Sequence, residues 1–356
     1  GTKSAAKGGF TSIACMPNTN PTVDNIGIVR YIIEKARKEG FVNVYPIGAI
    51  TKGLEGKELS EMGSMQEAGI VAVSDDGKPV INGDIMRKAL IYAGQFGLPV
   101  ISHCEDLNIT DGGSMNEGVT STLLGLRGIP SSSEDVMVAR EILLSEYTNI
   151  PVHIAHVSTK TSVELVRQAK KRGIKVTAET CPHYFTLTEK ACQDYDTNTK
   201  MNPPLRSQSD LEAVIEGLRD DTIDIIATDH APHHHDEKNV EFERAANGIV
   251  GFETALALSY TNLVEKGYLE FSQMLNKITV NPAKMLKLDK GVLECGKTAD
   301  LILVDFDNEY TVDVSKFASK GKNSPFDGFS LKGKVLLTMV GGKISYSDDK
   351  LLSGDI

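Results

Sequence analysis

The most informative segment of the chain reads Ile226-Ala-Thr-Asp-His-Ala-Pro-His-His-His235. The largely apolar run Thr222–Ala227 predicts a buried strand, and an acid and four of the chain's eight histidines follow it directly. A strand with Asp and His at its carboxyl end is typical of the active-site rim of a parallel α/β barrel. The alternative is a polar loop in which His233–His235 are solvated surface residues.

Strand-like runs alternate with helix-like segments along the chain. The predicted strands are Phe10–Cys15, Val42–Ala49, Ile70–Val73, Val100–His103, Val152–His156, Lys175–Thr180 and Ile223–Thr228. Helical spacing is clearest in Asp24–Glu39, Asp84–Phe96, Ser133–Tyr147, Thr161–Arg172, Gln208–Leu218 and Gly251–Lys266. Short apolar runs suit strands that are buried on both faces. Their alternation with helices predicts a parallel sheet with right-handed crossovers.

We therefore predict an α/β fold of the TIM-type (β/α)8 barrel class, with the first strand missing from this chain. Seven strand units are countable where a barrel needs eight, and residues 1–9 have the pattern of the end of a helix. We expect the first strand to precede Gly1. The alternative is an open doubly wound sheet, but no GxGxxG or GxxxxGK[ST] loop follows any predicted strand, which disfavours its nucleotide-binding form.

The sequence pattern changes near Lys290. Short β-rich runs and turn residues replace the alternation, and residues 334–346 have the form of a hairpin with a Gly-Gly turn. We predict two domains: an N-terminally truncated barrel at residues 1–289, and a small β-sandwich appendage with a C-terminal tail at residues 290–356.

Composition limits the classes of partner. A net charge of −10 disfavours nucleic acid and anionic membrane surfaces as partners. The five cysteines form no CxxC pair, which disfavours a disulfide framework and a cysteine zinc site and fits a reducing cytoplasm. No apolar run approaches membrane-spanning length, and no signal peptide is recognisable. We expect a cytoplasmic protein that acts on a small molecule.

Acidic and histidine side chains follow four of the predicted strands at their carboxyl ends. They are Asp75 and Asp76, His103, His156, and Asp229 with His230. Carboxylates and imidazoles are the ligand set of zinc and similar divalent ions. Each side chain alone has a structural explanation, but agreement among four strands favours a metal site. Only one residue of the adjacent aspartates can point inward, and His153 is expected to face away from His156.

The predicted chemistry is metal-assisted hydrolysis of an amide-like bond. A bound metal lowers the pKa of water to near neutrality and supplies hydroxide. Asp229 is placed to accept the proton and pass it to a leaving nitrogen. Asn18, Asn202, Arg206 and His233 are donors at the same rim, suited to carbonyl or carboxylate groups of a substrate. A turn-forming role beside proline explains the two asparagines equally well.

Six motifs occur in a characteristic order. They are Met16-Pro-Asn-Thr-Asn-Pro21, Ser74-Asp-Asp-Gly77, His103-Cys-Glu-Asp106, His153-Ile-Ala-His-Val-Ser158, Lys200-Met-Asn-Pro-Pro-Leu-Arg206 and Ala227-Thr-Asp-His-Ala-Pro-His233. Together they resemble the class I dihydroorotases of the zinc amidohydrolase superfamily. The resemblance implies reversible cyclisation of N-carbamoyl-L-aspartate to L-dihydroorotate in pyrimidine biosynthesis, with a bridged pair of zinc ions.

Residue roles follow from the same resemblance. Asp76 would bridge the two metals where relatives use a carboxylated lysine, and His103 and His156 would complete one zinc site. Asp229 would ligate the other zinc and serve as the general base. The residues that would contact substrate are Asn18, Asn202 and His233, together with the backbone at Asn247 and Gly248.

One departure from the family pattern is large. The family's His-x-His-x-Arg signature on the first strand has no counterpart, since every histidine lies at or after His103. One zinc site is therefore expected to be incomplete, and a molecule that begins at Gly1 is expected to be poorly active and poorly stable.

Two alternatives compete with a dihydroorotase. The first is a dihydropyrimidinase or allantoinase, which usually bridges its metals with a carboxylated lysine; here Lys78 lies past the strand, in the loop. The second is a non-catalytic dihydroorotase-like subunit that scaffolds aspartate carbamoyltransferase; the retained ligands argue against it. The candidate protein partners are a second copy of the chain, as a homodimer, and aspartate carbamoyltransferase.

Overall fold

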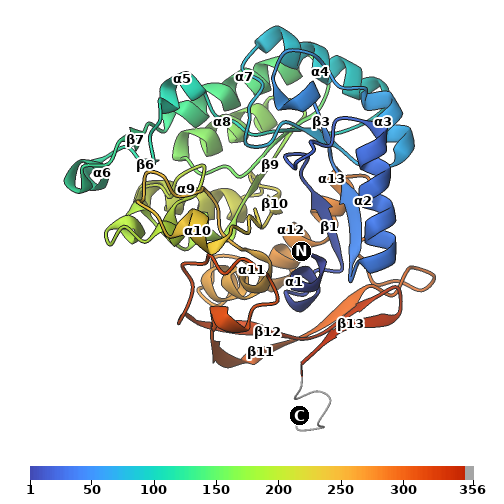
Figure 1. Cartoon of the computed structure of the whole chain (residues 1–356), viewed down its shortest axis with the longest axis vertical. Coiled ribbons are helices and arrows are strands. Elements are labelled where there is room, and N and C mark those ends of the chain that lie inside the picture. The colour runs from blue at the N-terminus through green and yellow to red at the C-terminus, as the bar shows by residue number, and fades with distance from the viewer. Residues whose placement is uncertain (349–356) are drawn as a thin grey trace.

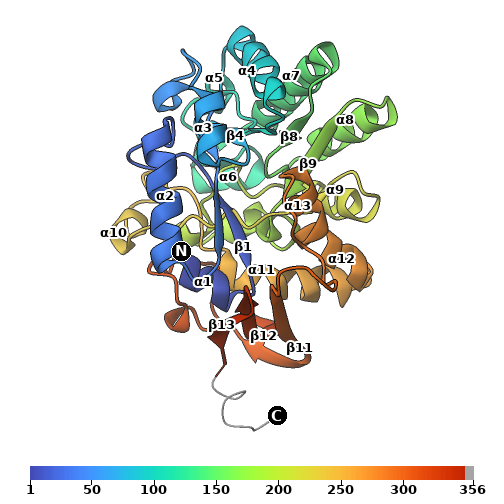
Figure 2. The same cartoon turned by 90° about the vertical axis from the view of Figure 1, so that its right-hand side faces the viewer.

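The computed structural model describes residues 1–348. Parallel strands occupy its centre, and helices cover their outer side (Figures 1 and 2). The central strands are β1 Ser12–Cys15, β2 Asn43–Pro46, β3 Gly48–Ala49, β4 Val73–Ser74, β5 Val100–Ser102, β8 Val152–Ile154, β9 Val176–Thr180 and β10 Ile225–Ile226. The helices between them are α2 Ile26–Glu39, α3 Met62–Ala68, α4 Gly83–Gln95, α7 Ser132–Thr148, α8 Lys160–Lys171 and α9 Gln208–Arg219.

The strand order follows the chain. Six strands pair in the order β10-β9-β8-β5-β4-β3, and β1 pairs with β2. The predicted strand at residues 42–49 is divided near Pro46: β2 pairs with β1, and β3 pairs with β4. The seven predicted strands therefore form one sequential parallel array, as in a barrel. An open doubly wound sheet would reverse its order at a switch point, so that alternative is wrong.

Capping side chains set the beginnings of the helices. The side chain of Asn25 accepts hydrogen bonds from two backbone amides at the start of α2, and Asn82 does the same for α4. Thr159 caps α8, and Ser207 forms a capping box at the start of α9. Such caps satisfy amides that have no partner within the helix. The helices predicted before β10 are confirmed, with ends shifted by at most two residues.

The chain after β10 is more irregular than predicted. The predicted helix Gly251–Lys266 is an α-helix followed by a π-helical turn, at Tyr260–Val264. The helices in this part are α10 His235–Lys238, α11 Phe252–Ser259, α12 Phe271–Ile278 and α13 Val280–Met285. A small arm, which the sequence did not predict, projects between β5 and α7 (Figure 1). It contains α5 Leu107–Thr110, β6 Met115–Asn116, α6 Val119–Leu124 and β7 Gly128–Ile129.

The C-terminal part forms one three-stranded antiparallel sheet within the described residues. Its strands are β11 Leu301–Thr311, β12 Ser330–Val340 and β13 Lys343–Ser347. The predicted hairpin is confirmed: Gly341 and Gly342 both have positive φ, as a tight two-residue turn requires. The sheet packs beside α1 (Thr2–Lys7), and the Thr338 hydroxyl donates to the carbonyl of Ala6 at 2.7 Å. The predicted C-terminal tail falls on residues 349–356, which lie outside the described residues.

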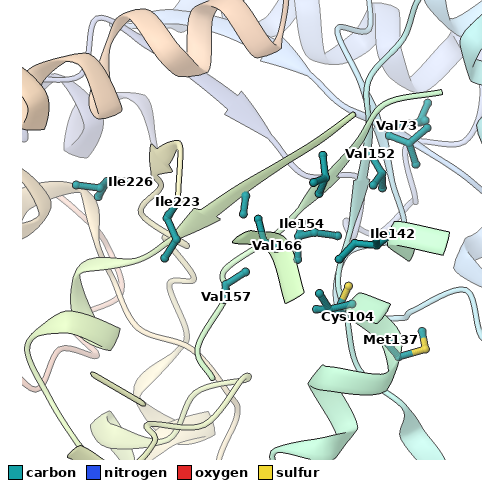
Figure 3. Close-up of a cluster of buried hydrophobic side chains, with 14 of the residues drawn as sticks. Val73, Cys104, Met137, Ile142, Val152, Ile154, Val157, Val166, Ile223 and Ile226 are labelled. Carbon is teal, nitrogen blue, oxygen red and sulfur yellow. The ribbon is translucent and has the colours of Figure 1, made fainter. Parts of the chain in front are cut away.

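The main core lies between the strands and the helices around them. Figure 3 shows Val152 and Ile154 of β8 in one cluster with Ile142 of α7 and Val166 of α8. Ile154 is fully buried. No helix in residues 1–348 is long and apolar enough to cross a membrane.

Truncating Ile154 to alanine is expected to lower the free energy of unfolding by about 2–5 kcal/mol, because the cavity cannot fully collapse. Urea denaturation measures the loss. The matched control is Ile91→Ala on α4, where the side chain is exposed and the expected change is within about 1 kcal/mol. Equal losses at both positions would contradict this account of the core.

Candidate metal centre and active site

Three of the predicted ligands converge at the carboxyl ends of neighbouring strands. Asp76 follows β4, His103 follows β5 and His156 follows β8. His103 Nδ1 and His156 Nε2 lie 2.8 Å apart, and Asp76 Oδ1 lies 3.7 Å from each of them. One ligand atom from each residue lies within 4.8 Å of the others. A carboxylate and two imidazoles at this spacing form a donor set for a divalent metal.

The electrostatics of the cluster also fit a metal. His156 presents Nε2 to His103 and Asp76, while its other ring nitrogen, Nδ1, is buried without a hydrogen-bond partner in residues 1–348. Burial alone would lower the pKa of His156, but a hydrogen bond to Asp76 and the charges of Asp229 and Asp76 raise it to about 9. The cluster therefore attracts positive charge.

The structure separates the two adjacent aspartates. Asp75 Oδ1 accepts hydrogen bonds from the backbone amides of Ile50 at 2.7 Å and Thr51 at 3.0 Å. Burial raises the pKa of Asp75, against the effect of these hydrogen bonds. Asp75 therefore ties the loop after β3 to the end of β4, and Asp76 alone reaches the histidines.

His153 and His156 lie in different surroundings. His153 Nδ1 is 2.8 Å from Thr177 Oγ1, and its Nε2 is 3.1 Å from Glu179 Oε2. His153 occupies the face of β8 opposite Val152 and Ile154, because successive side chains alternate. His156 lies beyond the strand with a φ of 33°, so the alternation has ended before it. Backbone turning, and not strand alternation, places His156 in the cluster.

Glu105 is a site residue that sequence reasoning missed. Its Oε2 lies 2.9 Å from His103 Nε2 and accepts a hydrogen bond from Asn202 Nδ2 at 2.8 Å. Burial alone would raise the pKa of Glu105, but its hydrogen bond to His103, the charge of His103 and the Asn202 contact lower it to about 2. A carboxylate on the outer nitrogen orients a metal-binding imidazole, so Glu105 directs His103 Nδ1 toward the cluster. The only signal was an acid two residues after a strand-end histidine.

Asp229 follows β10 and is not part of the three-residue cluster. Burial raises the pKa of Asp229 to about 6, and the charge of Asp76 adds to this effect while the charge of His156 opposes it. Asp229 therefore lies within electrostatic range of the cluster. Its φ of 43°, like that of His156, is in the left-handed region, which is strained for residues other than glycine. Such strain is concentrated at functional sites.

The predicted substrate residues fall into two groups. Asn18 Nδ2 donates to Asp76 Oδ2 at 3.1 Å, and Asn202 binds Glu105, so both asparagines adjoin the metal ligands. In the other group, His233 Nε2 lies 2.7 Å from the carbonyl oxygen of Asn247. Gly248 has a φ of 112°, and a Cβ there would lie 2.6 Å from the Ala231 Cβ. Glycine is thus required where these segments meet.

Other predicted donors serve the fold. Arg206 is buried, and its guanidinium donates to Ser158 Oγ at 3.1 Å and Asn116 Oδ1 at 3.0 Å and pairs with Glu134. It is therefore committed to the interior and not to the rim. His234 and His235 have side chains 74% and 78% exposed, so the surface interpretation holds for these two histidines.

A buried lysine holds the segment that carries Asn247 and Gly248. Lys238 Nζ donates to the carbonyl oxygens of Ala246 at 2.7 Å, Gly248 at 3.2 Å and Lys200 at 3.4 Å. Burial, with the charge of Lys200, lowers the pKa of Lys238 to about 8. The Lys238 ammonium thus fixes the backbone of this segment, although its burial removes it from water and so disfavours its charged form.

Replacing Lys238 by methionine is expected to change how stability depends on pH. The lysine has a pKa of about 8 in the folded chain and 10.5 as a free group. Between these values the unfolded chain binds more protons, so the free energy of unfolding of the wild type rises with pH. The rise from this group is about 3 kcal/mol, and the variant lacks it.

Urea denaturation at about pH 7 and about pH 10 measures this effect, because other groups titrate equally in both proteins. The stability of Lys238→Met, measured relative to wild type, should be lower at the higher of the two pH values. Lys57→Met, at a side chain 80% exposed, serves as the control and should follow the wild type. Parallel behaviour of Lys238→Met and wild type would refute the assignment.

Comparison with solved structures defines the class of protein. The chain superimposes on L-hydantoinase (dihydropyrimidinase) from Arthrobacter aurescens with a TM-score of 0.88 and 27% identity, covering 97% of this chain and 79% of that one. Dihydropyrimidinase from Brevibacillus agri has the same fold, with a TM-score of 0.84 and 22% identity over 96% of this chain and 78% of the other. Residues 199–346 match the amidohydrolase family model. The fold and the site together define an amidohydrolase.

Sequence relatives specify the family. Residues 1–162 match the dihydro-orotase-like family model. The chain is 62% identical to a dihydroorotase of Acetivibrio thermocellus, over 99% of this chain and 83% of that protein. It is 57% identical to a dihydroorotase of Geobacter metallireducens, over 97% of this chain and 81% of the other. The chain belongs to the dihydroorotase family.

Proposed function

We propose that this protein is a dihydroorotase, which interconverts N-carbamoyl-L-aspartate and L-dihydroorotate in pyrimidine biosynthesis. The observation that carries the proposal is the convergence of Asp76, His103 and His156 at three strand ends, in a chain 62% identical to a dihydroorotase. A scaffold subunit has no need of this donor set, which disfavours that alternative. A dihydropyrimidinase is disfavoured because the two solved structures of that name share the fold at only 27% and 22% identity.

We assign the cofactor as zinc, with a pair of ions per chain as the family resemblance implies and with one of the two sites incomplete within this sequence. Asp76, His103 and His156 would hold one ion, with Asp76 shared between the two, and Asp229 would bind the second. The mixed carboxylate and imidazole donors support zinc over harder ions such as magnesium. When bound, zinc acidifies water and polarises a carbonyl group.

Asp229 is assigned the proton transfers. In ring opening, water adds to the ring amide carbonyl and the carbon–nitrogen bond breaks. The proton lost by the water is held at an Asp229 carboxylate oxygen and then passes to the departing nitrogen. Ring closure reverses each step and releases water.

The remaining residues are assigned to substrate. Asn18 and Asn202 are neutral donors beside the metal ligands, suited to the carbonyl oxygens of the ring. His233 and the backbone at Asn247 and Gly248 form the second group, suited to the substrate carboxylate and ring amide. Two separate sets of donors would fix the orientation of the ring between them, which lowers the barrier by positioning.

The decisive experiment compares two cyclic amides on the protein purified with zinc from its full reading frame, including any residues that precede Gly1. Ring opening of L-dihydroorotate and of dihydrouracil is followed by chromatography of the products. We expect turnover of dihydroorotate and little of dihydrouracil. Preference for dihydrouracil would move the assignment to the dihydropyrimidinases, and zinc-free protein that turns over neither substrate would favour the scaffold.

Three assignments complete the proposal. The domain boundary is placed at residues 289 and 290, in the segment between α13 and β11. The location is cytoplasmic, as the unpaired cysteines suggest. The protein partners are a second copy of the chain and aspartate carbamoyltransferase. Light scattering of the protein alone, and mixed with the carbamoyltransferase, tests both partners.

A further inference from the structure

The loop between β11 and β12 places one asparagine against both segments of the second substrate group. Asn323 Oδ1 accepts a hydrogen bond from the backbone amide of His233 at 3.1 Å. Its Nδ2 donates to the carbonyl oxygens of Ala231 at 2.9 Å and Gly248 at 3.0 Å. The backbone carbonyl oxygen of Asn323 accepts a hydrogen bond from the backbone amide of Val250 at 2.9 Å. The side chain of Asn323 thus joins residues 231–233 to Gly248, and its backbone extends the link to Val250.

The chemistry of the amide group suits this position. Asn323 is 5% exposed, and a carboxamide offers two N–H donors and a carbonyl acceptor. Here both donors have a backbone carbonyl partner and the acceptor has a backbone amide. A buried group whose donors are already used does not bind substrate directly. Asn323 therefore acts through the backbone that it holds.

The rest of the loop is built for close contact with the same segment. A Cβ on Gly321 would lie 2.9 Å from the His233 carbonyl oxygen and from the Pro232 Cβ. The loop is also anchored shortly before Gly321, where the Glu253 carboxylate accepts hydrogen bonds from the backbone amides of Ala318 at 2.8 Å and Ser319 at 3.0 Å. The loop is thus fastened to α11 through residues 318–319 and to the substrate segments through residues 321–323.

We propose that Asn323 is a positioning residue that sets the distance between the His233 segment and the Gly248 segment, and thereby the affinity for substrate. The inference rests on the proposed function in that His233 and Gly248 are taken to contact dihydroorotate. It adds that the C-terminal sheet controls substrate binding through one loop. A site held in its bound geometry binds better, because less ordering is needed on binding.

The test uses Asn323→Asp in the zinc-supplied protein. Aspartate has the same shape but cannot donate to the two carbonyl oxygens, which its charge repels. We expect KM for dihydroorotate to rise about tenfold, with kcat and zinc per chain within about twofold of wild type. Asn308→Asp, at an exposed asparagine in β11, is the matched control and should leave all three values unchanged.

Gly321→Ala is the second variant, since its methyl group would lie 2.8 Å from Asn323 Oδ1 and 2.9 Å from the His233 carbonyl oxygen. It strains the link between Asn323 and the His233 segment while the carboxamide is kept, and it should also raise KM. Amide hydrogen exchange at residues 231–250, which needs no substrate, should quicken in both variants. Unchanged exchange and unchanged KM in either folded variant would overturn the proposal, as would a fall in kcat with loss of zinc. A wild type that is silent on dihydroorotate would instead refute the proposed function, and hydrogen exchange would still decide whether Asn323 holds the segment.

Discussion

Replacing Asp229 by asparagine is expected to lower kcat for dihydroorotate ring opening by about 10²–10⁴-fold, the range that general acid–base catalysis contributes. Asparagine has nearly the same shape, but its amide cannot accept the proton from water or deliver it to the departing nitrogen. Because the side chain lies past the end of β10, the fold should be retained.

Asp224→Asn is the matched control for this variant. Asp224 precedes β10 at its other end and pairs with Lys170 at 2.7 Å. Its loss should lower the melting temperature but leave kcat within a few fold. Steady-state kinetics and thermal melting of both variants give the comparison. An Asp229→Asn enzyme with kcat within tenfold of wild type would exclude Asp229 as the base.

Replacing His156 by asparagine is expected to abolish measurable turnover and to lower the zinc bound per chain by at least half. The cluster would keep Asp76 and His103 but lose one of its two imidazoles, and a divalent ion held by fewer ligands dissociates more readily. Elemental analysis after dialysis against a weak chelator measures the retained metal.

His153→Asn provides a control from the same strand. Both ring nitrogens of His153 are engaged, Nδ1 with Thr177 and Nε2 with Glu179, so neither is available to the metal cluster. Its replacement should therefore retain zinc while losing about 1–3 kcal/mol of stability, because buried partners lose their hydrogen bonds. Zinc loss in His153→Asn, or full zinc retention in His156→Asn, would reverse the assignment of the two histidines.

The central fold could be predicted because buried parallel strands leave a plain pattern of short apolar runs. The seven runs and the Gly-Gly hairpin all appear in the structure. The division of residues 42–49 into two strands could not be predicted from the position of the proline. Pro46 is still paired with β1 as the last residue of β2, and the change of partner to β4 comes only at Gly48. The arm at residues 105–130 was also missed, since elements of two to six residues show no periodicity.

The candidate site was predictable as a set of strand-end residues but not in its detail. Nothing in the local sequence distinguishes Asp75 from Asp76. What separates them is that the Asp75 carboxylate accepts hydrogen bonds from the backbone amides of Ile50 and Thr51, which lie elsewhere in the chain. Glu105 was missed because its partners, His103 and Asn202, are far apart in sequence. Asn323 was missed for the same reason, since all its contacts cross from the C-terminal sheet.

The left-handed backbone at His156 and Asp229 has a consequence for the evolution and engineering of this chain. Glycine adopts that conformation without the steric cost that other residues incur, which is about 1–2 kcal/mol. A His156→Gly protein would relax this backbone strain but would leave a cavity where the buried side chain had been, which costs stability. The strain is retained for the sake of the functional groups, so a stabilised variant library should keep both residues fixed.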